Sequence, residues 1–275
     1  MGKLNFLTAG IPIAAGKTGY KGGFGVLKEL NLDGLELEFV RGVRISEESK
    51  KAVKAAISQG FVVTAHAPFY VNLNAKEPEK VEASVGRIVE TAQTARELGG
   101  FSITFHAAYY MGNDKKTVFD RVVKQTERIC GILKEENNEI FIRPETTGKP
   151  TQWGDLEEIV ALSELFDFVL PCVDFSHLHA RSGGNFNTYD DFSRAFELIG
   201  NKLGTRALEN FHAHVAGIEY SAKGEKRHLN LEESDFNYKD LMKAFKKFGV
   251  NGVVVCESPN IETDAKILKD FYLSL

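Results

Sequence analysis

Residues 61–66 read FVVTAH, a short run of apolar and β-branched residues that ends in a histidine. An amphipathic stretch follows at 78–98, and a second short run, SITFH, follows at 102–106. Short apolar runs favour buried strands, and a helical stretch between two of them is typical of a parallel strand–helix–strand unit. The same pattern recurs along the whole chain.

The alternation of strand and helix repeats eight times. Short runs that predict strands lie at 4–8, 35–39, 61–66, 102–106, 140–145, 169–174, 208–214 and 252–257. Amphipathic stretches that predict helices follow them, at 25–31, 47–59, 78–98, 116–135, 156–165, 190–198, 238–248 and 263–272. This order indicates an α/β fold with a parallel sheet. At 275 residues, one closed (β/α)8 TIM barrel spanning 1–275 is favoured over an open doubly wound sheet.

The composition is that of an ordinary globular protein, with 43% hydrophobic and 26% charged residues. No stretch approaches the ~20 apolar residues of a membrane helix, so we expect a cytoplasmic protein with no membrane partner. The net charge of −4 argues against a generally basic nucleic-acid binder, although it leaves a locally basic face open. The three cysteines, Cys130, Cys172 and Cys256, are expected to be reduced thiols.

Histidines and carboxylates gather where the predicted strands end. Those at or just after strand ends are His66, His106, Glu145, Asp174, His177, His214 and Glu257. TIM barrels carry their catalytic residues at the carboxyl ends of the strands, where the loops begin. Side chains alternate in direction along a strand, so each of these residues is the last member of a set that can face the barrel interior.

Such a group needs cations. Crowded carboxylates repel one another and raise one another's pKa unless positive charge lies between them. Imidazole and carboxylate suit zinc and, less selectively, manganese or iron. Because seven ligands exceed the three or four that one zinc uses, we predict a multinuclear metal cluster at the C-terminal face of the barrel. For any one residue alone, the alternative is a hydrogen-bonded rim or core residue.

Two further carboxylates share one side of the second strand, Glu36 and Glu38. Arg143 lies two residues before Glu145 and therefore on its side of the fifth strand. If both sets face the barrel interior, we expect an ion pair between them, because an unpaired buried charge is costly.

The order of these motifs resembles endonuclease IV, the metal-dependent abasic-site endonucleases built on a xylose isomerase-like TIM barrel. The resemblance runs essentially from end to end. The motifs that carry it are HAPFYVNL at 66–73, FH at 105–106, ETTG at 145–148, CVDFSH at 172–177, FHAH at 211–214, RH at 227–228 and CESP at 256–259.

The resemblance implies three metal sites, usually occupied by zinc, of which two share a carboxylate. The implied ligands are His66, His106 and Glu145 for the first site, Glu145, Asp174, His214 and Glu257 for the second, and His177 and His228 for the third. It implies no ligand role for His179 or His212, which we expect to support the ligands or to pack.

The chain departs from the family pattern at the third site. The family supplies an aspartate two residues before the last histidine, and here that position is Lys226. A lysine there would repel a cation. Glu225, one place earlier, is the candidate substitute if the loop shifts; otherwise the third site is weak or lost, and two ions remain.

The resemblance implies hydrolysis of the phosphodiester 5′ to an abasic site in double-stranded DNA, leaving a 3′-hydroxyl. The cofactors would be two or three Zn²⁺ ions, with Mn²⁺ or Fe as alternatives, and Glu145 would be the central catalytic residue. The family also inserts an aromatic and a basic residue into the damaged duplex, and Phe69, its neighbour Tyr70, and Arg41 match those positions. Among the other loop cations, we expect Arg181 and Arg227 to contact DNA. We expect a monomer.

The main alternative is a sugar isomerase or epimerase of the same superfamily with one Mn, Mg or Co ion. Those enzymes resemble the chain at Glu145, Asp174, His214 and Glu257. Four histidines discriminate, because a single-metal isomerase does not need all of them: His66, His106, His177 and His228. A non-enzymatic binder of damaged DNA and an unrelated metallohydrolase are further alternatives.

Overall fold

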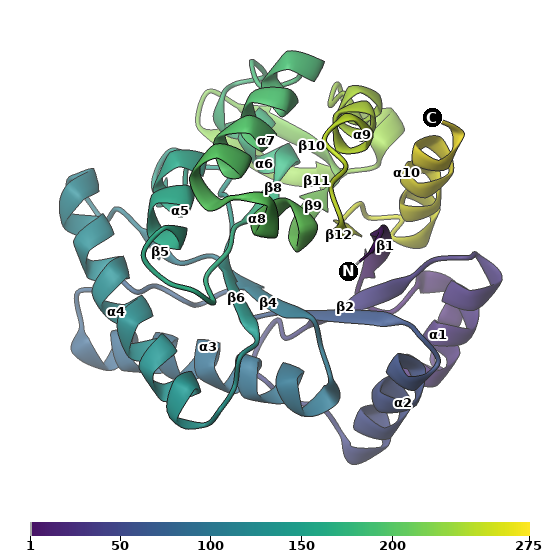
Figure 1. Ribbon diagram of the computed structural model, residues 1–275, viewed down its shortest axis with the longest axis horizontal. Coiled ribbons are helices and arrows are strands. Elements are labelled where there is room, and N and C mark those ends of the chain that lie inside the picture. The colour runs from purple at the N-terminus through teal and green to yellow at the C-terminus, as the bar shows by residue number, and fades with distance from the viewer. Residues whose placement is uncertain (1) are drawn as a thin grey trace.

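The computed structural model describes residues 2–275, in which eight parallel strands form one sheet surrounded by helices (Figure 1). The strand order is β6-β4-β3-β2-β1-β12-β9-β8. The strands are β1 (Leu4–Ala9), β2 (Gly34–Glu38), β3 (Val62–His66), β4 (Ser102–Phe105), β6 (Phe141–Pro144), β8 (Cys172–Asp174), β9 (Phe211–Val215) and β12 (Gly252–Cys256). Each coincides with one predicted run, which confirms the predicted α/β class.

The sheet closes on itself between its two outer strands, β6 and β8. Isolated parallel bridges join Ile142 to Val169 and Glu145 to Cys172 across this seam. Pro171 has no N–H to contribute to the ladder, and its carbonyl instead accepts a hydrogen bond of 3.0 Å from Nη1 of Arg143. The closure confirms a single TIM barrel rather than an open sheet.

The long helices form the outer ring. They are α1 (Gly19–Glu29), α2 (Glu47–Ser58), α3 (Pro78–Leu98), α4 (Lys115–Glu135), α5 (Leu156–Ser163), α7 (Tyr189–Leu203), α9 (Tyr238–Lys247) and α10 (Glu262–Ser274). Local sequence explains several ends: Ser46 and Asp114 accept capping bonds at the starts of α2 and α4, and Gly99 ends α3 in the left-handed conformation. Two short helices, α6 (Phe175–Arg181) and α8 (Thr205–Glu209), were not predicted.

Two small antiparallel sheets lie beyond the barrel strands and were also not predicted. One pairs β5 (Ala108–Tyr109) with β7 (Gln152–Trp153), and the other is a hairpin of β10 (Gly217–Ser221) and β11 (Gly224–Leu229). Both follow the carboxyl ends of barrel strands in sequence, so they extend the face on which the candidate site lies. Among residues 2–275, no helix is long and apolar enough to cross a membrane.

The interior of the barrel differs from the layer between sheet and helices. The outer layer is apolar and includes a cluster of phenylalanines, in which Phe175 lies 5.6 Å from Phe196 and 5.7 Å from Phe245, centroid to centroid. The interior combines a small apolar group, Leu7, Val253 and Val255, with fully buried polar side chains. These polar side chains include Glu36, Ser102, Arg143 and His212.

The predicted ion pair inside the barrel is wrong. The guanidinium of Arg143 donates to the carbonyls of Pro171 and Asn210 and lies 5.1 Å from the ring centre of Phe141. Within the described residues, no ion pair joins Arg143 to Glu36 or Glu38. Arg143 thus donates hydrogen bonds to backbone carbonyls near the seam between β6 and β8. Burial lowers the pKa of Arg143 to about 9.

Candidate metal centre

A first group of potential ligands comes from three successive barrel strands. His66 ends β3, His106 follows β4, and Glu145 follows β6. The Nε2 atoms of His66 and His106 each lie 3.1 Å from a different carboxylate oxygen of Glu145. One ligand atom from each residue lies within 4.8 Å of the others, close enough to share one ion.

A second group shares Glu145 with the first. It consists of Glu145, Asp174, His214 and Glu257, again with ligand atoms within 4.8 Å of one another. Nδ1 of His214 lies 3.5 Å from Oε1 of Glu145 and 3.3 Å from Oε1 of Glu257. Glu145 therefore belongs to both groups, in agreement with the shared carboxylate that the resemblance implies.

A third group combines Asp174, His177 and His228. Asp174 is the N-cap of α6, where its Oδ1 accepts a hydrogen bond of 2.6 Å from the backbone N–H of His177. This cap explains the Asp-x-x-His spacing, because it turns both side chains toward the same site. His228 comes from β11 of the hairpin rather than from a barrel strand.

Glu225 also faces the third group, because the hairpin contains a bulge. Glu219 pairs with Arg227 and Tyr220 with Glu225, so Lys226 is one extra residue on β11. Oε2 of Glu225 lies 3.6 Å from Nε2 of His177, whereas Nζ of Lys226 lies 3.0 Å from Oε1 of Glu219. The lysine is thus paired on the outer side of the hairpin, and the carboxylate of Glu225 lies beside His177.

Gly148, the last residue of ETTG, makes room for this arrangement. Its carbonyl accepts a hydrogen bond of 2.9 Å from the backbone N–H of Glu225. A Cβ at Gly148 would lie 2.7 Å from Cβ of Glu225 and 3.0 Å from Cδ2 of His177. Nothing in the sequence alone connects Gly148 with the hairpin.

Three of the histidines are oriented by backbone carbonyls. Nδ1 of His66 lies 2.7 Å from the carbonyl oxygen of Ala67. Nδ1 of His177 lies 2.9 Å from that of Thr146, and Nδ1 of His228 lies 3.2 Å from that of Glu257. A carbonyl can only accept, so in each ring Nδ1 carries a hydrogen, and Nε2 is the nitrogen that would bind a cation. Metal-binding histidines are held in this way by partners of their other nitrogen.

The electrostatics of the centre also favour the binding of cations. Burial would raise the pKa of Glu145, but the charges of His106 and His214 outweigh it and hold that pKa well below its usual value. Burial likewise opposes charge on His66, yet Glu145 raises its pKa to about 10. Oδ2 of Asp174, Nδ1 of His214 and Nε2 of His228 are buried and make no hydrogen bond within the described chain. Divalent cations would satisfy both the charge and these atoms.

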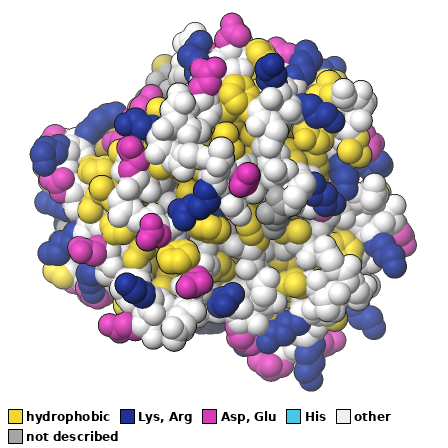
Figure 2. Space-filling view, viewed as in Figure 1, with side chains coloured by type: hydrophobic (Ala, Val, Ile, Leu, Met, Phe, Trp, Pro, Cys, Tyr) yellow, Lys and Arg dark blue, Asp and Glu magenta, His cyan; other side chains and the backbone are white. Residues whose placement is uncertain are grey.

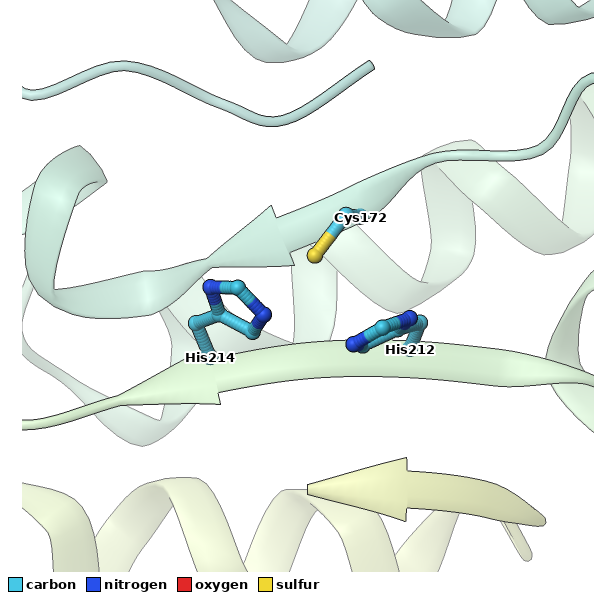
Figure 3. A group of neighbouring side chains, drawn as sticks. All are labelled: Cys172, His212 and His214. Atoms are coloured by element: carbon cyan, nitrogen blue, oxygen red, sulfur yellow. The ribbon is translucent and has the colours of Figure 1, made fainter. Parts of the chain in front are cut away.

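A further group, Cys172, His212 and His214, lies deeper in the barrel, where the three side chains point toward one another (Figure 3). Nδ1 of His212 lies 3.0 Å from Oγ of Ser102, and its Nε2 lies 3.1 Å from Oε2 of Glu36. Burial raises the pKa of Cys172 to about 12, which disfavours a metal-binding thiolate. We therefore interpret this group as support beneath the centre. His179 contacts Asp235 at 2.9 Å, so it too has a supporting partner.

The residues predicted to bind DNA lie in loops, on the hairpin and, for Arg181, at the end of α6. Phe69 and Tyr70 are 57% and 40% exposed, and their ring centres lie 4.1 Å apart. Arg41 is exposed, whereas Arg227 lies 2.8 Å from Glu219, and Arg181 donates to the carbonyls of Lys149 and Gln152. On the face drawn in Figure 2, cationic and anionic side chains are interspersed. DNA contact by these residues stays a prediction.

Residues 24–273 match the model of the xylose isomerase-like TIM barrel family. The chain belongs to this family. It is 44% identical over 272 residues to an uncharacterized protein of Methanocaldococcus jannaschii, covering 99% of this chain and 98% of that protein. It is 23% identical over 208 residues to a probable endonuclease 4 of Mycoplasma genitalium, covering 74% of this chain and 68% of that protein.

Two solved structures show how widely the fold is used. A D-tagatose 3-epimerase-like protein superposes with a TM-score of 0.74 at 20% identity, covering 98% of this chain and 97% of its own. Endonuclease IV from Thermus thermophilus superposes with a TM-score of 0.72 at 17% identity, covering 99% and 100%. The fold is therefore shared by proteins described as an epimerase-like protein and as an endonuclease, and the fold alone does not choose between these activities.

Proposed function

We propose that this protein is a metal-dependent phosphodiesterase that cleaves DNA on the 5′ side of abasic sites. The observation that carries the proposal is the third group, in which His177 and His228 lie together with Asp174, beside two groups that share Glu145. A further carboxylate, that of Glu225, lies 3.6 Å from Nε2 of His177. A sugar isomerase with one metal has no use for this third group. Three adjacent cations suit a phosphodiester, whose transition state carries charge on several oxygens.

The proposed centre holds two or three zinc ions, with manganese or iron as alternatives. The residues that would hold them are His66, His106 and Glu145, then Glu145, Asp174, His214 and Glu257, then His177, His228 and Glu225. Bound divalent cations would supply Lewis acidity toward the phosphate and favour deprotonation of water near neutral pH. Glu145 sets the spacing of the first two sites because one carboxylate serves both.

Exposed apolar side chains on the first four barrel loops support a nucleic-acid substrate. They are Ile13, Val40, Phe69, Tyr70, Tyr109 and Met111. Arg87 lies 5.2 Å from the ring centre of Tyr70 and holds it in place. Aromatic side chains beside a metal centre can stack on bases exposed at a damaged site. Arg41, Arg181 and Arg227 are the cations proposed to contact the backbone.

The second candidate function is a sugar epimerase or isomerase with one metal. The group of Glu145, Asp174, His214 and Glu257 is complete on its own, and the structural likeness to the D-tagatose 3-epimerase-like protein favours keeping this candidate. In that case the histidines at positions 66, 106, 177 and 228 would be dispensable for metal binding.

A nicking assay separates the two candidates. The substrate is a duplex with a single tetrahydrofuran abasic analogue, labelled on the damaged strand, and an undamaged duplex is the control. We expect one cut on the 5′ side of the analogue, a 3′-end that a polymerase extends, loss of cleavage with chelator, and recovery with Zn²⁺. Thr64→Val should cleave normally, since Thr64 is buried in the barrel and its hydroxyl makes no hydrogen bond within the described chain. Epimerisation of a ketose such as D-tagatose without any nicking would refute the nuclease.

A further inference from the structure

Glu36 occupies an unusual place for a carboxylate. It lies within β2, faces the barrel interior, and is fully buried. Its Oε1 lies 3.0 Å from Nε2 of His214, and its Oε2 lies 3.1 Å from Nε2 of His212. No lysine or arginine contacts this carboxylate in the part of the chain that the structure describes. A buried charge is costly unless it is paired, so the two imidazoles are the groups that stabilise the buried carboxylate of Glu36.

We propose that Glu36 is a positioning residue that fixes His214 with its hydrogen on Nε2, so that Nδ1 is the metal-binding atom. The proposal rests on the metal centre proposed above. His214 differs in this respect from His66, His177 and His228, whose Nδ1 atoms face backbone carbonyls. A carboxylate partner also makes an imidazole a stronger donor toward a metal than a neutral carbonyl does.

His212, the second histidine beside Glu36, has a partner of its own on its other ring nitrogen. His212 and His214 are separated by one residue on β9, so both face the interior. The hydroxyl of Ser102 lies 3.0 Å from Nδ1 of His212 and can donate to it, which leaves the ring hydrogen on Nε2, toward Glu36. Ser102, His212 and Glu36 thus form a buried series that ends at His214. The two carboxylate oxygens of Glu36 each face one of the two histidines, whereas an amide would present its N–H to one of them.

Nitrogen NMR of the histidines in the zinc-loaded wild-type protein tests the assignment directly. With ¹⁵N-labelled histidine, we expect His214 to carry its hydrogen on Nε2 and to bind zinc through Nδ1. His66, His177 and His228 should show the opposite arrangement. Zinc on Nε2 of His214, with a hydrogen on Nδ1, would overturn the proposal, and this measurement needs no variant that might fail to fold.

Metal affinity tests the role. Glu36→Gln preserves volume but presents an amide N–H to one histidine, so we expect the second site to bind Zn²⁺ roughly 10- to 100-fold more weakly in chelator competition. Ser102→Ala should weaken binding less. Thr64→Val is the matched control, because Thr64 is buried and pairs with Glu36 in the register of β2 and β3. It should bind zinc as the wild type does.

The geometry of the site gives an independent readout. In the Co²⁺-substituted protein, Glu36→Gln should change the visible d–d bands, and Thr64→Val should not. A Glu36→Gln protein that unfolds at lower temperature but keeps the wild-type zinc affinity and Co²⁺ spectrum would show a merely structural role and overturn the inference. If the wild type itself binds no transition metal, the proposed metal centre is refuted, and so is the inference that rests on it. These two failures are therefore distinguishable without any nuclease assay.

Discussion

The proposed ligands of this protein come from two kinds of structure, which differ in how firmly the sequence determines their positions. The first two groups lie at the ends of barrel strands, where the backbones of His66, Glu145 and His214 contact the neighbouring strands on both sides. Part of the third group lies on the hairpin of β10 and β11, which pairs with itself and stands outside the barrel sheet. There, Glu225 and His228 depend on one bulge for their relative direction.

The difference shows where a metal site can change during evolution. A residue inserted in a barrel strand would turn every following side chain to the other face and shift its pairing with both neighbours. A residue inserted in a hairpin can be absorbed by a bulge, at the cost of one pairing position. The hairpin group can therefore gain, lose or relocate a ligand while the barrel groups stay intact. The predictions below test this independence.

The largest effect is expected from Glu145→Gln, which alters the carboxylate shared by both barrel groups. An amide lacks the negative charge that balances two cations, so both sites should weaken together. Elemental analysis should show the loss of two ions per chain, and nicking of the abasic duplex should fall by more than the roughly 100-fold typical of losing a supporting residue. Retention of both ions would contradict the bridging role of Glu145.

A smaller effect is expected from Glu225→Gln, which removes the carboxylate of the hairpin group. We expect one ion fewer per chain, with the two barrel ions retained and nicking reduced rather than abolished. Glu232→Gln, an exposed residue beyond the hairpin, is the matched control and should keep the wild-type metal content. An unchanged ion count in Glu225→Gln would mean that the third group does not use this residue.

The same contrast describes what could be predicted from the sequence. All eight barrel strands were predicted, because buried parallel strands are continuous apolar runs and a period of two fixes which side chain points inward. The seven candidate ligands were predicted from their positions at or just after strand ends, and the structure brings them together in overlapping groups. The hairpin could not be placed in this way, because its strands are polar and partly exposed, and its bulge leaves no signal in composition.

Glu36 and Arg143 show a second limit of the sequence. An inward direction was predicted only as a condition for their ion pair, and both side chains are fully buried. Periodicity gives the face of a strand but not the distance across the barrel, so it could not tell that Arg143 lies at the seam where the carbonyl of Pro171 needs a donor. Nor could it tell that Glu36 reaches the two histidines of β9.

A still smaller effect is expected from Glu219→Gln, which concerns the outer side of the hairpin. The carboxylate of Glu219 pairs with both Lys226 and Arg227. Its loss would free up to two cations, and the plot of log K against log[salt] for DNA binding should steepen by roughly one to two units. Metal content and the melting temperature should not change measurably, because exposed ion pairs contribute little to stability. An unchanged salt dependence would place these cations away from the DNA.

The smallest effect is expected from deletion of Lys226, although it changes the chain length. Deletion removes the extra residue of the bulge and leaves Glu225 two residues before His228, on the same face of a regular strand. The third ion should therefore be retained, with an affinity close to that of the wild type. The matched control combines Glu225→Gln with Lys226→Asp, which restores a carboxylate two residues before His228. In the bulged strand that side chain faces Glu219, so this variant should not recover the third ion. Recovery in the control would show that spacing from His228 rather than the bulge determines the ligand, whereas loss in the deletion would show that Glu225 needs the bulge to reach the site.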